Sequence, residues 1–593
     1  MPARTWYVSC SPRSPEKIAP EIELLQQFEG VNWNKQDENG RKIHQITFAE
    51  ALKSCESFEG KISEKEPEFS ARDRIAPMKT YGFAYQDSEE RLRITGAGRQ
   101  LIRGERIQEL FLKQMLKWQY PSYQHGGNKR TRHLYLPTDE MCIFPFVETL
   151  RLARELDGLT KPEIAIFVLT VFDAMKIPDI TEELQKFRDE LDNLRGRIPR
   201  KRFIREFHQN RFREIYSEEI SSGKITTRES HQPSSVEKFI NTKVRNSIDI
   251  ADAAIRYFRA TGLFTFGTKA VRLVVSPFKS QEVNQILNEM SFEPVPFYDD
   301  VDKFYEYLGN PDIPSLPWQT TNVMILNLRK LQNVTGVHQV SESEFIQLTQ
   351  NEQKGIILEL EETHKQQLLI EYERNLQRPK MAKEIEEMFS AIKQKDVIDP
   401  PLYFEWNMWR ALVCLNDCYK CHPNFSLGDD FLPLSFAPGN KSDLEVEYNN
   451  DFVVLVEVTL STGARQYDTE GEPVTRHIGK FQKAENEREN PRTVYGLFVA
   501  PSINSNTANY FFVHLKHLQN PDFGGFLSII PLSIQQFINI FKFCKIEHAF
   551  NRHKFRELLD SLVALGKNAN DSNEWTNKFD EVIEEWKLSY QTK

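Results

Sequence analysis

The chain has 593 residues, 40% of them hydrophobic and 11% aromatic, which is long and apolar enough for several domains with buried cores. Its seven scattered cysteines, the absence of an apolar run of transmembrane length and the lack of a signal-peptide pattern exclude a disulfide-stapled protein, and we expect a cytoplasmic protein without membrane contact. The formal net charge of −9 divides into +2 for residues 1–300 and −11 for the remainder, so only the first half favours polyanionic partners.

The first 70 residues predict a strand, a turn and a helix. The strand begins at Trp6, and the prolines that follow it indicate a turn. Apolar residues from Ile18 to Phe28 then recur at roughly helical spacing. Arg13 and Lys17 lie in or beside the turn, where they would either contact DNA phosphates or remain ordinary solvated surface.

Residues 72–95 predict a helix followed by a hairpin, and Gly96 opens the next helix. The same order recurs later, with a helix over residues 249–259 and a hairpin over residues 261–275. This order is typical of winged-helix domains, in which the hairpin follows the recognition helix. Because winged helices also serve as protein-interaction modules, DNA binding is one of two interpretations here.

Basic segments accompany these elements. A loop from Tyr123 to His133 is suited to phosphate contact. The stretch from Arg195 to Arg213, anchored by phenylalanines, is either a DNA-binding surface or a solvated helix face with extended arginines. The candidate DNA contacts of the first half are Arg13, Lys17, Arg72, Arg74, Lys79, Arg91, Arg93, Lys117 and Gln119.

The middle of the chain predicts a connection. Prolines are concentrated in residues 276–340, which indicates an interdomain segment. Residues 342–395 are charged and strongly helical, and they would form either a spacer or a dimerisation surface.

Residues 443–460 predict a hairpin that carries two acidic side chains. Apolar and polar residues alternate up to Tyr448, and the second strand, from Phe452, is almost wholly apolar. A three-residue turn at residues 449–451 would place Asp443 opposite Glu457, with Cβ atoms roughly 5 Å apart. Two carboxylates this close in a dry site need a proton or a cation between them, and Mg²⁺ prefers such oxygen ligands. The alternative is a surface hairpin with solvated acids.

The elements around the hairpin favour the metal site. We expect helices over residues 403–418, 476–488, 505–518 and 534–544, and strands over residues 493–500 and 526–530. This αβββαβα-like order is the layout of the PD-(D/E)xK nucleases, although Ser442 and Thr459 stand where that motif has Pro and Lys.

The residues Cys418, Cys421 and His422 match the spacing of a haem-attachment site. A chain without an export signal would not receive covalent haem, and no second Cys/His cluster has zinc-finger spacing. We therefore expect these residues only to end the preceding helix.

Several blocks of the sequence together resemble one family. They are residues 6–17, 72–83, 117–122, 257–259 and 261–264 in the first half, and residues 404–406, 437–440, 443, 457–459 and 472–477 in the second. They span nearly the whole chain and resemble the AlwI/PleI/MlyI family of type IIS restriction endonucleases, which includes site-specific nicking enzymes.

The resemblance implies roles for particular residues. Asp443 and Glu457 resemble the Mg²⁺ ligands, and Glu405 resembles the helix acid that completes the metal site. Glu472 and His477 resemble an ancillary catalytic pair.

The family also tends to lack the lysine of the general motif, which agrees with Thr459. Lys480, one turn beyond His477, is a candidate for the group that orients the attacking water.

We therefore expect a multidomain α/β protein with a mainly helical, winged-helix DNA-recognition part, a helical linker and a C-terminal PD-(D/E)xK core. The expected domains are recognition subdomains at residues 1–140 and 141–280, a linker at 281–340 and a catalytic domain at 341–593. The expected function is Mg²⁺-dependent, site-specific cleavage of double-stranded DNA a few base pairs from a short asymmetric site.

Some alternatives remain open. The enzyme would nick one strand or cut both, with a transient homodimer or a small second subunit for the second strand, and the host would hold a companion methyltransferase. A DNA-binding regulator with a decayed nuclease fold and a structure-specific repair nuclease are the rival functions.

Overall fold

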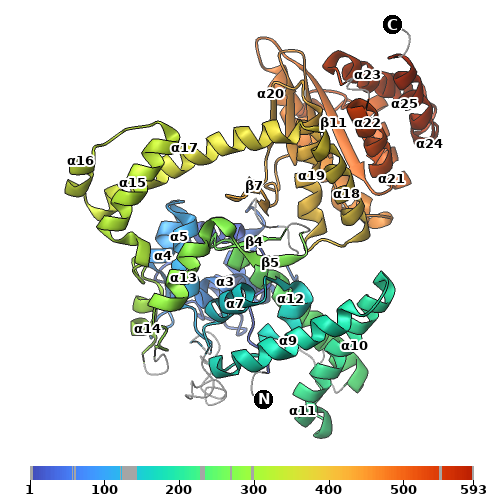
Figure 1. Cartoon of the computed structure of the whole chain (residues 1–593). Helices are drawn as coiled ribbons and strands as arrows, with labels where there is room; N and C mark the ends of the chain where they lie inside the picture. Colours follow the sequence, from blue (N-terminus) through green and yellow to red (C-terminus); the bar gives the residue numbers. More distant parts are fainter. Residues whose placement is uncertain are drawn as a thin grey trace. The chain divides into compact units, whose positions relative to one another are not determined.

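The computed structural model describes residues 4–590 except 56–57, 59–61, 121, 123–142, 227–233, 268–269, 296–299 and 547–549. The basic loop expected at residues 123–133 thus lies outside the described residues. The chain divides into two compact units, Met1–Val323 and Met324–Lys593, and the first is mostly helical while the second holds an extended sheet (Figure 1). None of the helices in the described part of the chain is long and apolar enough to cross a membrane.

The first unit is built from short strands and many helices. Its elements are α1 (Ile18–Leu25), α2 (Ile43–Leu52), α3 (Pro67–Thr80), β1 (Ala84–Gln86), β2 (Leu92–Ile94), α4 (Gly96–Ile102), α5 (Ile107–Lys117), α7 (Pro145–Glu155), β3 (Leu159–Thr160), α8 (Lys161–Ile166), α9 (Ile177–Asp192), α10 (Arg197–Ile215), α11 (Ser217–Ser221), α12 (Val236–Arg259), β4 (Phe264–Phe266), β5 (Arg272–Val275), α13 (Ser280–Glu289) and α14 (Val301–Leu308).

Two groups of elements in this unit share one chain order. In the first, α1, α2 and α3 precede the β1–β2 hairpin, whose second strand is flanked by an antiparallel bridge between Asn32 and Arg91. In the second, α7, β3, α8 and α12 precede the β4–β5 hairpin, and the three strands form an antiparallel sheet in the order β3-β5-β4. Each hairpin directly follows a helix, as the sequence predicts.

An aromatic core joins the two groups. Trp6 packs edge-on against Trp118 with ring centroids 5.7 Å apart, and Tyr81 lies 4.8 Å from Tyr257. All four of these side chains are fully buried. The residues before α1 are therefore part of the unit's centre, because large aromatic side chains contribute most of the apolar area that such a core buries.

The second unit begins within α15, which contains the division between the units. Its elements are α15 (Thr321–Thr335), α16 (Glu342–Gln347), α17 (Gln350–Leu376), α18 (Pro379–Gln394), α19 (Pro400–Leu415), β6 (Lys420–Pro423), β7 (Ser426–Leu427), β8 (Pro433–Ser435), β9 (Leu444–Tyr448), β10 (Phe452–Val458), α20 (Ala464–Asn486), β11 (Thr493–Ala500), α21 (Ser505–Lys516), β12 (Ile529–Ser533), α22 (Ile534–Ile546), α23 (Arg552–Asn568), α24 (Ser572–Asn577) and α25 (Phe579–Leu588).

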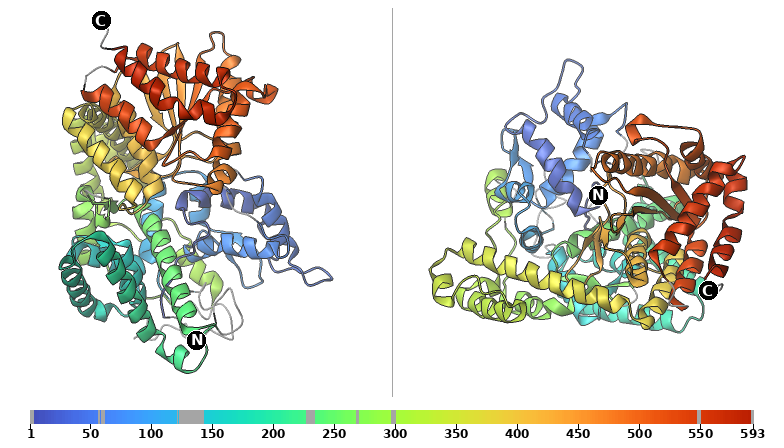
Figure 2. Two further views of the ribbon diagram at one scale, coloured as in Figure 1. Left: turned by 90° about the vertical axis from the view of Figure 1, so that its right-hand side faces the viewer. Right: turned by 90° about the horizontal axis from the view of Figure 1, so that it is seen from above.

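A mixed five-stranded sheet forms the centre of this unit. The strand order is β12-β11-β10-β9-β6, with β10, β11 and β12 parallel and with β9 antiparallel to both of its neighbours. Helices pack along the sheet (Figure 2). Phe498 packs against Phe511 of α21, whereas Tyr495 donates to Asp560 of α23. Because neighbouring side chains of a strand point to opposite faces, the two faces of β11 are covered by different helices.

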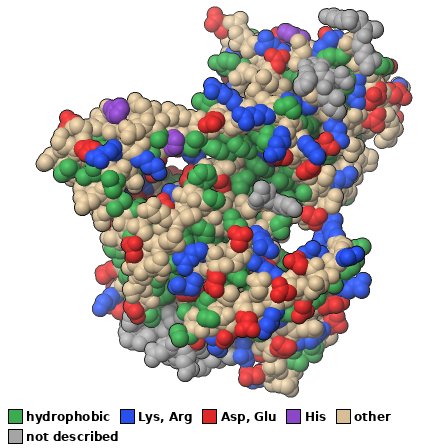
Figure 3. Space-filling view, viewed as in Figure 1, with side chains coloured by type: hydrophobic (Ala, Val, Ile, Leu, Met, Phe, Trp, Pro, Cys, Tyr) green, Lys and Arg blue, Asp and Glu red, His purple; other side chains and the backbone are tan. Residues whose placement is uncertain are grey.

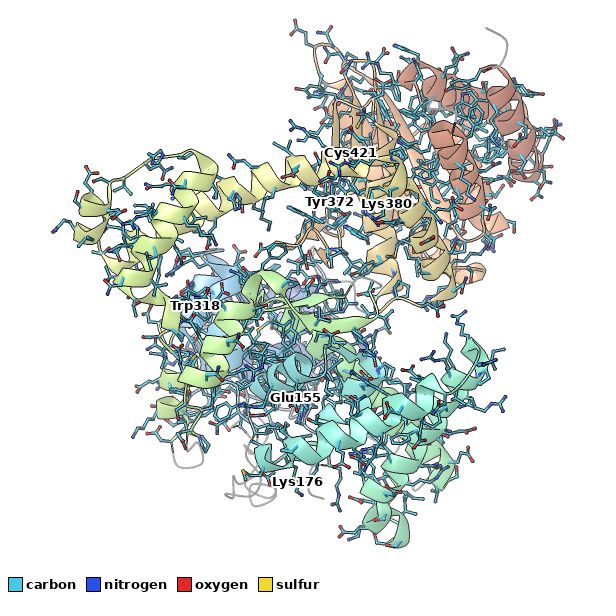
Figure 4. The ribbon with its side chains drawn as sticks, in the orientation of Figure 1. Glu155, Lys176, Trp318, Tyr372, Lys380 and Cys421 are labelled. Carbon is cyan, nitrogen blue, oxygen red and sulfur yellow. The ribbon has the colours of Figure 1, made fainter. Side chains whose placement is uncertain are left out.

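The long helix α17 joins the helices after the division to the sheet part. Tyr372 near its C-terminal end stacks on Trp409 of α19 and on Phe431, with centroids 6.1 and 5.0 Å apart (Figure 4). The helix is fixed at its other end by a capping box between Thr349 and Glu352, which satisfies backbone donors at the N-terminus.

Several predicted elements of the second unit have different bounds in the structure, and the helix expected at residues 403–418 is α19 at Pro400–Leu415. The helix expected at residues 476–488 begins at Ala464, and the strand expected at residues 526–530 is β12 at Ile529–Ser533. Gly471 and Pro473 lie inside α20, where their low helix propensity predicts an end. The buried side chains of Val474 and Ile478 keep this segment helical, since tertiary packing overrides local propensity.

Candidate active site

The β9–β10 hairpin brings Asp443 and Glu457 together. Tyr448 pairs with Phe452 and Leu444 with Val456, so the turn has three residues, as predicted. Continued by one position, this register sets Asp443 opposite Glu457. Strand β10 is buried along its length, so the carboxylate of Glu457 lies in a region with little water.

Asp443 sits at the entrance of β9, where its side chain is half-buried. Its Oδ2 accepts a hydrogen bond from the Val458 backbone N–H at 2.7 Å. Burial raises the pKa of Asp443 well above its usual value, and the charges of Glu457 and Glu470 raise it further against that hydrogen bond. The carboxyl is thus held where ionisation is costly unless a cation compensates it.

Glu405 of α19 is a third acid near the hairpin pair. Its side chain accepts from the Ala437 N–H at 3.3 Å, and the residue is 7% exposed. Burial, followed by the charge of Asp443, raises the pKa of Glu405 well above its usual value. The helix therefore brings a third carboxyl within electrostatic reach of the hairpin acids.

Glu457 contacts His477 of α20. Oε1 of Glu457 lies 2.8 Å from Nδ1 of His477, and Nε2 of His477 lies 2.9 Å from the carbonyl oxygen of Gly439. A carbonyl only accepts, so Nε2 carries a proton that it donates to Gly439. Burial and the charge of Glu470 raise the pKa of Glu457, while burial lowers that of His477.

Glu470 is an acid of this site that the sequence interpretation missed. Its Oε1 accepts from the Thr459 hydroxyl at 2.8 Å and lies 3.4 Å from the Ser461 hydroxyl. Glu472, which was expected in the ancillary role, is 64% exposed in its side chain and pairs with Arg476 at 3.0 Å. The sequence signal that could have identified Glu470 is Thr459, because its hydroxyl at the end of the hairpin needs an acceptor.

The carboxylates of Asp443, Glu457 and Glu405 are of the chemical type that binds a metal ion through oxygen. Among them, hydrogen bonds to Asp443, Glu457 and Glu405 each use one oxygen of the carboxyl group, and the second oxygen of each suits a hard cation. No set of three His, Cys, Asp or Glu side chains in the described chain comes together in metal-binding geometry. Contrary to the sequence prediction, Cys418, Cys421 and His422 do not end the preceding helix, because α19 already ends at Leu415 and the last two lie in strand β6.

Two of the candidate DNA contacts are buried with structural partners. The ammonium group of Lys117 donates to the carbonyl oxygens of Leu308 at 2.7 Å and Asn310 at 2.6 Å. The amide of Gln119 bonds both backbone groups of Val295, at 2.8 and 3.0 Å. These side chains hold α14 and the segment before it, so residues expected in a linker pack as part of the first unit.

Arg74 and Arg13 also have acidic partners. Arg74 is buried and lies 2.7 Å from Glu21, whose pKa burial raises to about 7 despite the neighbouring guanidinium. Arg13 is 43% exposed and lies 3.2 Å from Asp249 of α12. Arg74 is therefore a core residue, whereas Arg13 and the half-buried Lys17 stay accessible at the surface.

The remaining candidates lie on α3 and the first hairpin. Arg91 and Arg93 flank the turn, with Nε atoms 3.2 and 2.8 Å from Asp87, and each side chain is 38% exposed. Lys79 donates to the side-chain oxygen of Gln86 in β1. Burial lowers the pKa of Lys79 to about 8. Arg72 is exposed on α3. Arg91 and Arg93 are therefore partly exposed but paired with acids of the same turn, Arg91 with Glu89 as well as Asp87.

Comparison with known proteins relates the chain to restriction endonucleases. The model of the family described as AlwI restriction endonuclease matches residues 79–540. Among solved structures, the chain is similar to the small subunit of the heterodimeric restriction endonuclease R.BspD6I, with 26% identity over 34% of this chain and 98% of that one, at a TM-score of 0.28. A search of curated proteins finds no match.

Proposed function

The chain belongs to the AlwI restriction endonuclease family, whose model matches more than three quarters of its length, and from this we propose that it is a type IIS enzyme. It binds a short asymmetric sequence in duplex DNA through its first unit. Its second unit hydrolyses a phosphodiester bond a few base pairs to one side.

The observation that carries the proposal is that two buried acids and one half-buried acid lie near the open end of the β9–β10 hairpin. Asp443, Glu457 and Glu405 come from two strands' ends and a helix, and their pKa values are all raised. Such a group is expensive to keep in a folded protein without a function. The mixed sheet around it supports a PD-(D/E)xK core.

Asp443, Glu457 and Glu405 would hold Mg²⁺ through their oxygens. A bound Mg²⁺ acidifies water and neutralises charge that develops on the scissile phosphate. His477 orients Glu457 by its contact with Oε1, and its own orientation is fixed by the Gly439 carbonyl. Glu470, bonded to Thr459, takes the ancillary place expected for Glu472.

The first unit offers two hairpin-bearing groups that we interpret as winged helices. Accessible cations border the first of them, at Arg72, Arg91 and Arg93. Basic and acidic side chains are interspersed over the face drawn in Figure 3, so any DNA-binding surface is local rather than spread over the molecule.

Helix α10 is the most basic element of this unit. Arg202 and Arg205 are exposed, whereas Phe203 and Phe207 on the other side pack against Phe187 of α9, at 5.5 and 4.8 Å. The apolar side holds the helix on the protein, and the exposed side presents positive charge to phosphates.

Cleavage of both strands would require a second catalytic centre. A transient homodimer or a small second nuclease subunit supplies it, and a companion methyltransferase protects the host's own sites. Without such a partner the protein nicks one strand.

The test is incubation of supercoiled plasmid with the purified protein in Mg²⁺ or EDTA, followed by agarose electrophoresis. Discrete linear fragments in Mg²⁺ alone indicate a double-strand cutter, and open circles with one nick position indicate a nicking enzyme. Asp443→Asn should abolish both products while specific binding of a DNA fragment persists. Intact plasmid in both lanes with the unaltered protein would contradict the proposal.

A further inference from the structure

The active site is rich in carboxylates and has no lysine where the general motif has one. Thr459 occupies that position, and its hydroxyl is already bonded to Glu470 at 2.8 Å and accepts from the Ser461 N–H at 3.1 Å. A DNA phosphate that approaches Asp443 and Glu457 meets like charge, which costs free energy unless cations offset it. Another residue must then supply the positive charge of the missing lysine.

Arg476 is a cation at the edge of this group. It precedes His477 on α20, and its charge opposes the raised pKa of Glu457 and helps to lower that of His477. Its Nη1 lies 2.8 Å from Asn440, the residue next to Gly439, whose carbonyl oxygen lies 2.9 Å from the imidazole that contacts Glu457. Its side chain is 27% exposed, so it is neither sealed in the core nor fully solvated.

Two side chains fix the guanidinium in place. Nε donates to Glu472 at 3.0 Å, and Nη1 donates to the side-chain oxygen of Asn440 at 2.8 Å. Among the described residues these bonds use Nε and Nη1, and Arg476 has five N–H donors in a planar fork. The donors on Nη2 suit an oxyanion, because arginine binds phosphate through parallel N–H groups.

We propose that Arg476 is a further catalytic residue, which binds the scissile phosphate and replaces the lysine of the general motif. The inference rests on the proposed function. A catalytic role for Arg476 also accounts for the exposed carboxylate of Glu472. Glu472 lies one helical turn before Arg476 and positions its guanidinium. Asn440 does the same from the loop that leads into Asp443.

A purely structural role is the competing explanation. Arg476 and His477 both contact the loop at residues 439–440, so Arg476 would then only tie that loop to α20. The two roles differ in what Asn440→Ala does. This substitution removes the tie but keeps the positive charge, whereas Arg476→Ala removes both.

The experiment measures single-turnover cleavage, at saturating protein and Mg²⁺, of a duplex that the unaltered protein cuts. We expect Arg476→Ala to lower the rate about 100-fold, the loss typical for removing one donor that stabilises developing charge. Affinity for the same duplex in EDTA should stay within about twofold, since recognition by the first unit is unaffected. Arg476→Lys should recover part of the rate, and Asn440→Ala should lose less than about fivefold.

Lys483→Ala is the matched control, because it removes an exposed cation from the same helix, and its rate should be unchanged. Equal losses for Asn440→Ala and Arg476→Ala, or a larger loss for Lys480→Ala than for Arg476→Ala, would overturn the inference. If Arg476→Ala lowers the thermal unfolding midpoint, Arg476→Lys decides, since a rate no higher than that of Arg476→Ala refutes a charge-based role. An unaltered protein that cuts no DNA would refute the proposed function, and this inference with it.

Discussion

His477 and Glu457 share a single proton across a 2.8 Å contact between Nδ1 and Oε1. The Gly439 carbonyl requires a proton on Nε2, so Nδ1 is protonated only if Glu457 is ionised. Burial raises the pKa of the carboxyl and lowers that of the imidazole, and both shifts favour the proton on Glu457. Metal binding by this carboxylate must therefore displace the proton to His477 or to solvent.

His477→Ala should raise the Mg²⁺ concentration needed for half-maximal cleavage by about tenfold or more, the usual cost of losing a side chain that orients a metal ligand. In both proteins the requirement should fall as pH rises from 6 to 8, because a carboxyl with a raised pKa loses its proton more readily at high pH. Cleavage rates measured against Mg²⁺ concentration at three pH values test this. An unchanged Mg²⁺ requirement with a lower maximal rate at every pH would instead assign His477 to the chemical step.

Glu470→Gln and Glu472→Gln separate the two neighbouring acids of α20. Glu470 is bonded to Thr459 and acts on the charge of Asp443 and Glu457, so its loss should lower the cleavage rate about 100-fold. Glu472 is exposed and contacts Arg476. Because a glutamine at this position still accepts that hydrogen bond, the cleavage rate of Glu472→Gln should fall less than tenfold. Cleavage that becomes faster in Glu470→Gln would mean that Glu470 only repels the other acids.

The hairpin and the parallel strands could be predicted because their signals are local. Alternation up to Tyr448, the apolar run from Phe452 and the turn between them fix the register that opposes Asp443 and Glu457. Strand β11 has the predicted bounds, Thr493–Ala500, since a β-rich run between turn residues specifies a buried strand.

The remaining site residues depend on contacts that no local pattern carries. Glu470 was missed because Pro473 and Gly471 predict the end of a helix, whereas buried packing extends α20 back to Ala464. The burial of Lys117 was missed for a related reason. A lysine in a basic segment predicts a surface, but here carbonyl groups about 190 positions away along the chain accept from it.

His208 should make the first unit sensitive to acid. Its Nε2 lies 3.0 Å from the Ser247 hydroxyl, which itself donates to the Val244 carbonyl at 2.8 Å, so the imidazole is the donor between them. Burial, with a smaller effect of Arg211, lowers the pKa of His208 from 6.5 to about 4. A depressed folded-state pKa gives stability that is present above the unfolded pKa and is lost as pH falls toward the folded one.

The shift corresponds to about 3 kcal/mol of unfolding free energy, lost between pH 6.5 and 4. Urea unfolding of the unaltered protein and of His208→Gln across this range measures it. The variant should be less stable at pH 7 but should lose about 3 kcal/mol less on acidification. Parallel pH curves for the two proteins would show that His208 does not carry the effect.

Arg202 and Arg205 of α10 should contribute to DNA binding without affecting the chemistry. Both are exposed, and they lie opposite the phenylalanines that hold the helix, so Arg202→Ala with Arg205→Ala should leave the fold intact. If each contacts one phosphate, the slope of log K against log salt concentration becomes shallower by about 1.8. Binding measured between 50 and 200 mM salt, roughly the range over which such contacts dominate, tests this.

The matched control is the pair Lys380→Ala and Lys383→Ala, which removes the same charge from two exposed positions of α18 in the second unit. For this pair, the slope of log K against log salt concentration should equal that of the unaltered protein, because lysines that do not contact phosphates release no counterions from the DNA. The cleavage rate at saturating protein should be the same for the α10 pair as for the unaltered protein. A slope that the α10 pair leaves unchanged would identify this helix as a solvated surface and restrict DNA binding to the hairpin-bearing groups.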